Sequence, residues 1–187
     1  ETLRRNPSAW MANINLGNIY LGQQRFADAR KQFESALAER PGYDEALYNL
    51  GVVNSQQGDR IAAEKCYRDT IASNPKFTKA YNNLANLKLL QGAQDQALDL
   101  WREALAIDPL YVLARVNLAN NLANSRRTPE AIDVIRAGLT LRPDEPRLNL
   151  TLAPFLLDAG DLEGARRAAQ QAISSGAALP EELERAL

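Results

Sequence analysis

Apolar residues along this chain are spaced as they are on one face of an α-helix. Near the start of the chain, Ile19 and Tyr20 lie three and four positions after Leu16. These apolar residues do not alternate with polar ones, as they would in a half-buried strand. The same spacing returns in every later block. The pattern predicts an all-α chain with eleven helices, at residues 8–22, 26–39, 43–57, 59–72, 77–91, 93–106, 111–124, 128–140, 145–158, 161–175 and 180–187.

The predicted helices come in pairs that repeat every 34 residues. Leucine occupies one place in five successive pairs: Leu16, Leu50, Leu84, Leu118 and Leu152. The residue after it is always glycine or alanine, and a second alanine follows twelve positions later: Ala29, Ala63, Ala97, Ala131 and Ala165. Small residues let two helices approach closely, while leucine and the aromatic residues Phe33, Tyr67 and Trp101 fill the space beside them. Because one pair cannot bury its own apolar face, we expect neighbouring pairs to stack.

Glycine and proline mark the ends of the predicted helices. Four glycines stand where the two helices of a pair should turn: Gly22, Gly58, Gly92 and Gly160. Asp59 and Asp161 suit the N-cap of the helix that follows. Four prolines end the second helix of the first four pairs: Pro41, Pro75, Pro109 and Pro143. Pro154 differs, because it falls inside a predicted helix, where its ring removes one hydrogen bond and favours a kink.

These features resemble the tetratricopeptide (TPR) repeat, and the match covers nearly the whole chain. The resemblance implies a superhelix of antiparallel helix pairs whose concave surface usually binds a peptide segment of a partner. Leu3 and Pro7 lie one period before Leu37 and Pro41, so residues 1–7 are interpreted as the tail of a truncated preceding repeat. The remaining divisions are four full repeats at 10–43, 44–77, 78–111 and 112–145, a degenerate fifth repeat at 146–179 and a C-terminal capping helix at 180–187.

Composition and charge narrow the range of functions. The 187 residues include 22 basic and 23 acidic side chains, a balance that argues against nucleic acid or an anionic membrane as the main partner. No apolar run approaches the roughly 18 residues of a membrane span. Histidine is absent, and there is no zinc spacing, phosphate-binding loop or nucleophile elbow. We therefore expect no catalytic site, cofactor or metal, and we expect the single cysteine, Cys66, to be a packed thiol.

The strongest functional signal is a row of asparagines that follows the repeat. Four of them lie 34 residues apart, and three more lie three positions later, on the same helix face. An amide carries both donor and acceptor, so it matches the C=O and N–H groups of a peptide unit. With the neighbouring groove positions of the TPR pattern, the candidate peptide-binding residues are Asn15, Asn18, Tyr48, Asn49, Val52, Lys79, Asn82, Asn83, Asn86, Asn117 and Asn120.

Two interpretations of the asparagine row stay open. The row is similar to the asparagine ladder in the TPR superhelix of O-GlcNAc transferase, which implies that it holds an extended chain by its backbone. Asparagine at these places also belongs to the general TPR pattern, in which case the side chains would either be inherited without a binding role or bond neighbouring helices. Helicity does not explain the row, because asparagine is a poorer helix former than alanine by roughly 0.5 kcal/mol.

A more specific TPR subtype does not fit. TPR domains that grip the C-terminal carboxylate of chaperones use a basic clamp with two asparagines. Asn18, Asn49 and Lys79 occupy three of its places. Ile14 and Asn83 stand at the two places where lysine and arginine are needed. Without those charged donors, tight capture of a terminal carboxylate is not expected.

We therefore expect a protein-protein interaction scaffold that binds an extended peptide segment of a partner. The alternative is a substrate-recruiting region of a larger, glycosyltransferase-like enzyme, since residues 6–17 resemble the start of TPR arrays that follow polytopic membrane glycosyltransferase-like regions in bacteria. A soluble domain in the cytoplasm or in a bacterial extracytoplasmic compartment fits both. Self-association through an exposed terminal repeat is a further prediction.

Overall fold

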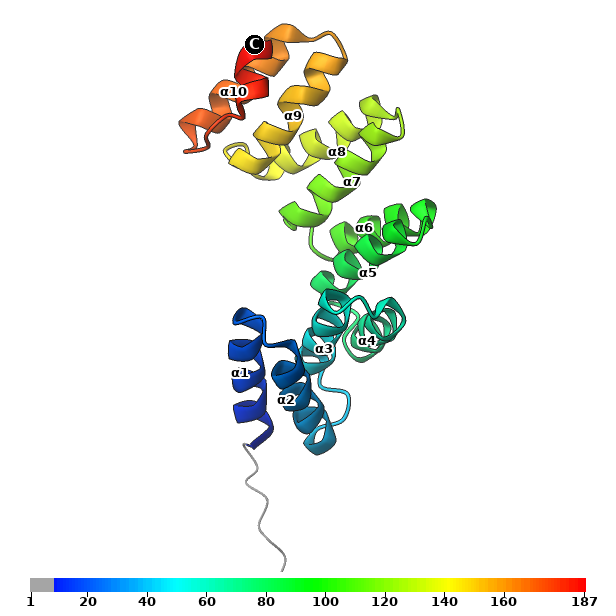
Figure 1. Cartoon of the computed structure of the whole chain (residues 1–187). Coiled ribbons are helices and arrows are strands. Elements are labelled where there is room, and N and C mark those ends of the chain that lie inside the picture. Colours follow the sequence, from blue (N-terminus) through cyan, green and yellow to red (C-terminus); the bar gives the residue numbers. More distant parts are fainter. Residues whose placement is uncertain (1–8) are drawn as a thin grey trace, which may run out of the picture. The chain divides into compact units, whose positions relative to one another are not determined.

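The computed structural model describes residues 9–187, and all regular structure in that range is helical (Figure 1). Its elements are α1 (Ala9–Gly22), α2 (Phe26–Glu39), α3 (Asp44–Gln56), α4 (Arg60–Ser73), α5 (Thr78–Leu90), α6 (Gln94–Ile107), α7 (Val112–Asn124), α8 (Thr128–Leu141), α9 (Pro146–Asp158), α10 (Leu162–Ser174) and α11 (Glu181–Ala186). Every predicted helix is present, with ends within one residue of expectation, so the all-α prediction is confirmed. The predicted repeat tail at 1–7 lies outside the described residues.

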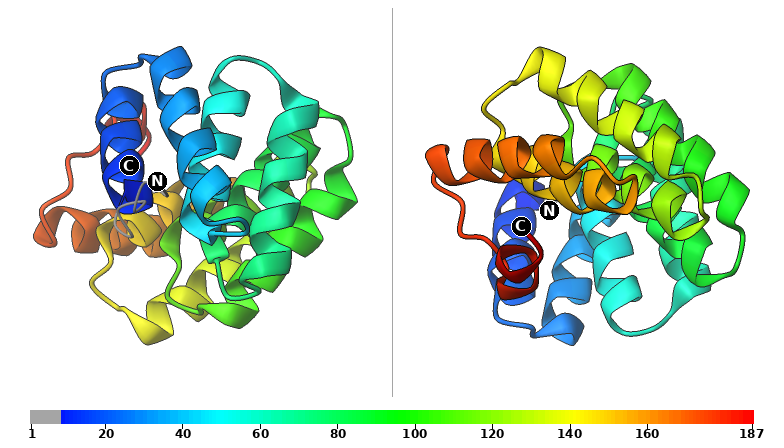
Figure 2. Two further views of the ribbon diagram at one scale, coloured as in Figure 1. Left: turned by 90° about the horizontal axis from the view of Figure 1, so that it is seen from below. Right: turned by 90° about the horizontal axis from the view of Figure 1, so that it is seen from above.

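The chain divides into two compact units, Glu1–Ala93 and Gln94–Leu187, each of which is described by itself. In the first unit, α1 packs on α2, α3 packs on α4, and α5 packs against α4 (Figure 2). In the second unit, α6 packs on α7, and the pairs α7–α8 and α9–α10 stack through α8 and α9. First and second helices therefore alternate along the chain, as the 34-residue period requires.

Small residues occupy the closest helix crossings. The recurrent alanines Ala29, Ala63, Ala97, Ala131 and Ala165 are completely buried. A Cβ atom added to Gly17 would lie 2.5 Å from the Phe33 ring, and one added to Gly51 would lie 2.7 Å from the Tyr67 ring. Since real Cβ contacts are essentially never that short, glycine at these two positions is what lets the Phe33 and Tyr67 rings approach so closely.

The turn inside each pair repeats its backbone conformation every 34 residues. In each of these five turns one residue has a positive φ, between 59° and 83°: Gln24, Gly58, Gly92, Arg126 and Gly160. The glycine-turn prediction is thus confirmed at three sites, whereas in the first pair Gly22 ends α1 and Gln24 takes the left-handed conformation. The N-cap predictions are also confirmed, because Asp59 accepts from the Ala62 N–H at 3.0 Å and Asp161 from the Gly164 N–H at 2.8 Å.

Junctions between pairs share a hydrogen bond that the sequence did not reveal. The side chain at the fourth place of a repeat donates to the carbonyl of the proline six residues earlier. Tyr81 donates to Pro75 at 3.2 Å, Arg115 to Pro109 at 2.7 Å, and Asn149 to Pro143 at 3.0 Å. Three chemically different side chains therefore hold three successive junctions in the same way.

The outer face of α1 is the exception to the pattern of burial. Ala46, Ala80 and Ala114 are completely buried, but Ala12, at the same place in the first repeat, is exposed. Likewise Leu84 and Leu118 are 4% and 2% exposed, whereas Leu16 is 37% exposed. No residue of α1 is charged, and none of the other described helices covers this face, so α1 presents an apolar surface there.

The last pair is covered by the short helix α11. Leu183 of α11 is buried, and the Arg166 guanidinium donates to the Leu187 carbonyl at 2.7 Å. The helix α9 continues through Pro154, whose ring is exposed and lines a pocket beneath α11 together with Leu150. The helix predicted at 180–187 is therefore present as α11, and it packs beside α9 and α10.

Candidate functional site

In the first unit, the asparagine row joins neighbouring first helices. The Asn49 side-chain amide on α3 donates to the Asn18 amide oxygen on α1 at 2.8 Å. The Asn83 amide on α5 donates to the Tyr48 hydroxyl on α3 at 3.1 Å. The structure thus brings these predicted residues together, and it shows the helix-bridging contacts of one of the two interpretations. Peptide binding by the same residues stays a prediction.

The other predicted residues are more widely distributed. Asn15 is exposed on α1, Lys79 is exposed at the start of α5 beside Phe77, and Asn86 is half-buried one turn further along α5 than Asn83. Asn82 is only 5% exposed, and its amide donates to the Asn83 oxygen at 3.2 Å. Asn82 is therefore a buried hydrogen-bond donor to Asn83.

Two predicted residues belong to the second unit. Asn117 is half-buried and Asn120 is exposed, and both lie on α7, three positions apart. They share one face of that helix. The row therefore consists of a set on α1, α3 and α5 and a separate set on α7.

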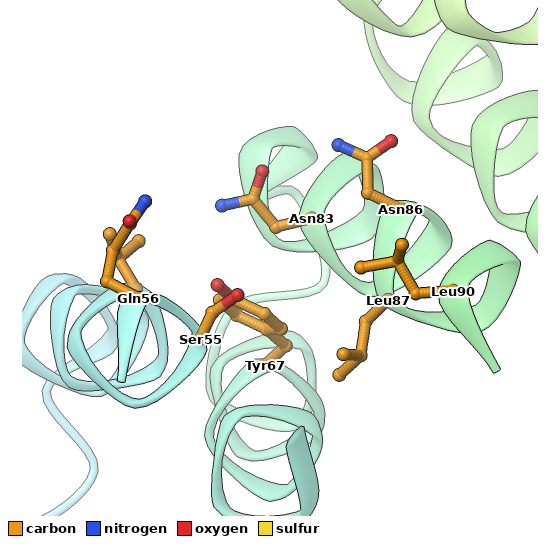
Figure 3. A pocket seen from close by; sticks show the side chains of 8 residues that line it. Ser55, Gln56, Tyr67, Asn83, Asn86, Leu87 and Leu90 are labelled. Carbon is orange, nitrogen blue, oxygen red and sulfur yellow. The ribbon is translucent and has the colours of Figure 1, made fainter. Parts of the chain in front are cut away.

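A pocket of about 200 Å³ opens beside the row in the first unit, and we call it the Tyr67 pocket. Three helices contribute its lining: α3, α4 and α5 (Figure 3). Its lining residues are Val52, Ser55, Gln56, Tyr67, Asn83, Asn86, Leu87 and Leu90. Val52, Asn83 and Asn86 were predicted, whereas the other five were not.

Tyr67 contributes to this pocket from a core position. Its side chain is 2% exposed and packs flat on Gly51, as Phe33 packs on Gly17 one repeat earlier. The hydroxyl end reaches the pocket beside Ser55 (Figure 3). Burial raises the pKa of Tyr67 to about 12, so its hydroxyl keeps its proton at neutral pH. In the sequence, the only indication of this role is that Tyr67 carries a hydroxyl at the place that Phe33 occupies one repeat earlier.

Aromatic contacts fix the Tyr48 hydroxyl that Asn83 meets. The Tyr48 ring centroid lies 5.0 Å from that of Phe77 and 6.1 Å from that of Tyr67, both in tilted arrangements. Burial raises the pKa of Tyr48, while the hydrogen bond from Asn83 lowers it by a smaller amount. The hydroxyl is therefore a neutral, rigidly placed partner for the Asn83 amide.

None of the residues that line the Tyr67 pocket is charged. Lys88 of α5 is instead paired with Glu64 of α4 at 2.7 Å, and Gln91 donates to the same carboxylate at 2.9 Å. Cys66 is buried with the Asn54 amide 3.5 Å from its sulfur, and burial raises the pKa of its thiol, as expected for a packed cysteine. The pocket is thus suited to recognition by neutral hydrogen bonds and apolar contact.

Within residues 9–187, no cluster of three or more histidine, cysteine, aspartate or glutamate side chains is arranged to hold a metal ion. In the same range, no helix has the length and apolar character required to cross a membrane.

Comparison with known proteins identifies the family. The tetratricopeptide repeat family model matches residues 1–43, 14–60, 55–112 and 116–182. The chain belongs to the tetratricopeptide repeat family. This confirms the TPR resemblance, and the all-helical structure is consistent with an α-α solenoid. A search of curated protein sequences finds no significantly similar relative.

Solved structures show the same fold. The PilF protein of Pseudomonas aeruginosa is 24% identical with a TM-score of 0.78, over 91% of this chain and 78% of that one. MamA is 17% identical with a TM-score of 0.70, over 92% and 98%. YrrB, a TPR protein with an unusual peptide-binding site, is 17% identical with a TM-score of 0.64, over 93% and 90%. Family and fold together indicate a protein-protein interaction scaffold, and TPR repeat proteins are generally not catalytic.

Proposed function

We propose that the first unit binds an extended peptide segment of a partner protein across the face formed by α1, α3 and α5. The observation that carries this proposal is the hydrogen bond between Asn49 and Asn18, which orients two amides on neighbouring helices. An amide has two N–H donors and two acceptor lone pairs, so one mutual bond leaves most of the capacity of both for a ligand. A peptide backbone offers matching donors and acceptors along its length.

The spacing of the row supports an extended ligand. Asn18, Asn49 and Asn83 lie on three successive first helices, so amides follow one another at the helix-to-helix step. The Tyr67 pocket adjoins the last of them and offers room for a side chain. In the second unit, Asn117 and Asn120 provide the same side-chain chemistry on α7. The alternative of substrate recruitment for a larger enzyme stays a prediction.

A peptide-display selection tests the proposal. The immobilised protein would be exposed to a library of displayed peptides with twelve random positions, in parallel with an Asn18→Ala/Asn49→Ala variant. Loss of one exposed hydrogen bond costs the fold about 1 kcal/mol, so circular dichroism should show an intact variant. Asn124→Ala is the matched control, since Asn124 is an exposed asparagine outside the row at the end of α7.

We expect the unaltered protein and the control to enrich the same peptides, and the double variant to bind them at least tenfold more weakly. If the double variant enriches the same peptides with unchanged affinity, the amides only bridge helices. If no peptide binds the unaltered protein above background, peptide recognition on this face is wrong.

A further inference from the structure

The Tyr67 pocket is lined by amide, hydroxyl and apolar side chains, and we consider which side chain of a ligand fits all three. Gln56 of α3 and Asn83 and Asn86 of α5 surround its opening with amides (Figure 3). The hydroxyl of the buried Tyr67 lies deeper, with that of the exposed Ser55 beside it, and the leucines of α5 supply apolar surface. Every polar group of the lining is neutral and is able both to donate and to accept a hydrogen bond.

Two of these polar groups have fixed positions. The Asn83 amide donates to Tyr48 at 3.1 Å and its oxygen accepts from Asn82 at 3.2 Å, so neighbours on two sides hold its orientation. The Tyr67 ring is held against Gly51 and cannot withdraw its hydroxyl without leaving the core. A pocket with fixed polar groups discriminates between ligands because it does not rearrange to suit a poor match.

This chemistry disfavours two classes of side chain. A carboxylate or ammonium group would lose hydration and meet no opposite charge among the lining residues. A purely apolar side chain would remove water from the exposed Ser55 hydroxyl and from the amides at the opening without replacing its hydrogen bonds. Neither class therefore satisfies the whole pocket.

We infer that the Tyr67 pocket takes a primary carboxamide side chain of the bound peptide, glutamine or its shorter homologue asparagine. The inference rests on the proposed peptide binding and names the residue class that it selects. The carboxamide donates and accepts as the lining amides and hydroxyls require. Its methylene groups contact Leu87 and Leu90 of α5 and Val52 of α3.

Synthetic peptides test this selectivity. One peptide enriched by the selection above would be made with glutamine, glutamate or methionine at the position of the shared carboxamide. Glutamate has nearly the same shape as glutamine but adds a charge, and methionine keeps a similar length without the polar end. We expect glutamate and methionine to weaken binding at least tenfold, measured by fluorescence polarisation.

Two variants of the protein locate the effect in the pocket. Tyr67→Phe removes one hydroxyl and keeps the ring that packs on Gly51, so the preference for glutamine over methionine should fall several-fold. Gln56→Lys adds a positive charge at the opening and should restore binding of the glutamate peptide. Gln23→Lys is the matched control, since Gln23 is an exposed glutamine that does not line the pocket, and it should restore nothing.

The outcomes separate this inference from the proposed function. Enriched peptides without a carboxamide at a constant position, or an equally tight glutamate peptide, would overturn the inference while leaving peptide binding intact. Equal rescue by Gln56→Lys and Gln23→Lys would also overturn it, because the preference would then not arise in the pocket. Absence of any bound peptide would remove the proposed function and this inference together.

Discussion

Substituting Gly51 with alanine should destabilise the first unit, although alanine is the better helix former. In an ordinary helix interior, the change would stabilise by about 1 kcal/mol. Here the new Cβ would lie 2.7 Å and 2.8 Å from two atoms of the Tyr67 ring and 3.1 Å from the Cys66 Cβ. Overpacking a filled core costs about 1–3 kcal/mol, and the upper end applies because Tyr67 is only 2% exposed. We expect a net loss of about 1–2 kcal/mol.

Urea unfolding measures this loss. With a slope of about 2 kcal/mol per molar urea, the midpoint should fall by about 0.5–1 M. Trp10 is in the first unit and Trp101 in the second, so tryptophan fluorescence in a Trp101→Phe background reports the first unit. Gly22→Ala is the matched control, because a Cβ at Gly22 meets nothing within 4 Å and should leave the midpoint unchanged or slightly raised.

The fourth repeat indicates how the loss is relieved. There Ala119 replaces the glycine and Ile135 replaces the aromatic ring, and both are completely buried. In a Tyr67→Ile background, Gly51→Ala should therefore be neutral or stabilising, so the two changes should be coupled by at least 1 kcal/mol. An equal cost in both backgrounds would refute the close ring contact as the cause.

Four further substitutions test the structure. Gln24→Gly and Arg126→Gly should each stabilise by about 0.5 kcal/mol, because both residues hold the left-handed conformation that costs a side chain about 1 kcal/mol; an unchanged urea midpoint would contradict this. Asn54→Leu should stabilise by about 1 kcal/mol, since the buried Asn54 oxygen has no hydrogen-bond partner and Leu122 fills the same place in the fourth repeat; a lower midpoint would contradict it. The hydrogen bond from Lys88 lowers the pKa of Glu64 from its ordinary value of 4.5, so the contribution of Glu64 to stability is complete above that ordinary value, which the unfolded chain keeps, and is lost as the pH falls through the lower folded pKa. In the Glu64→Gln variant, the free energy of unfolding should therefore decrease less than in the unaltered protein as the pH is lowered from about 5 to 3. If both proteins lose the same free energy over this range, the pair of Glu64 and Lys88 contributes nothing.

Most of the fold could be predicted from the 34-residue period, because residues that recur at this period make the same packing contacts in every repeat. Leucine, alanine and glycine at constant places predicted the eleven helices and three of the five left-handed turns. Gln24 and Arg126 were missed because neither residue type favours that conformation, and the surrounding turn imposes it. The side chains that hold the prolyl carbonyls were missed because Tyr81, Arg115 and Asn149 share no chemical class.

The candidate site was predicted less completely. Asparagines recur, so the row was visible, but the sequence did not show that Asn82 is buried or that Asn49 and Asn18 bond each other. Tyr67 fits the core pattern of the repeat, so the sequence suggests only a buried ring. The structure shows that this ring packs against Gly51 and that its hydroxyl end lines a pocket. A periodic pattern predicts what the repeats share, whereas a binding site depends on where they differ.

The exposed apolar face of α1 makes the two ends of the array unequal as places to add further repeats. At α11, a new helix pair would have to displace Leu183 from its buried position before it could attach. At α1, Ala12 and Leu16 already present the residue types that later repeats place beneath a preceding pair. A copy of residues 44–77 fused directly to Trp10 would therefore keep the 34-residue step, meet a matching surface and lengthen the asparagine row by one helix. The array is thus more readily extended at α1 than at α11.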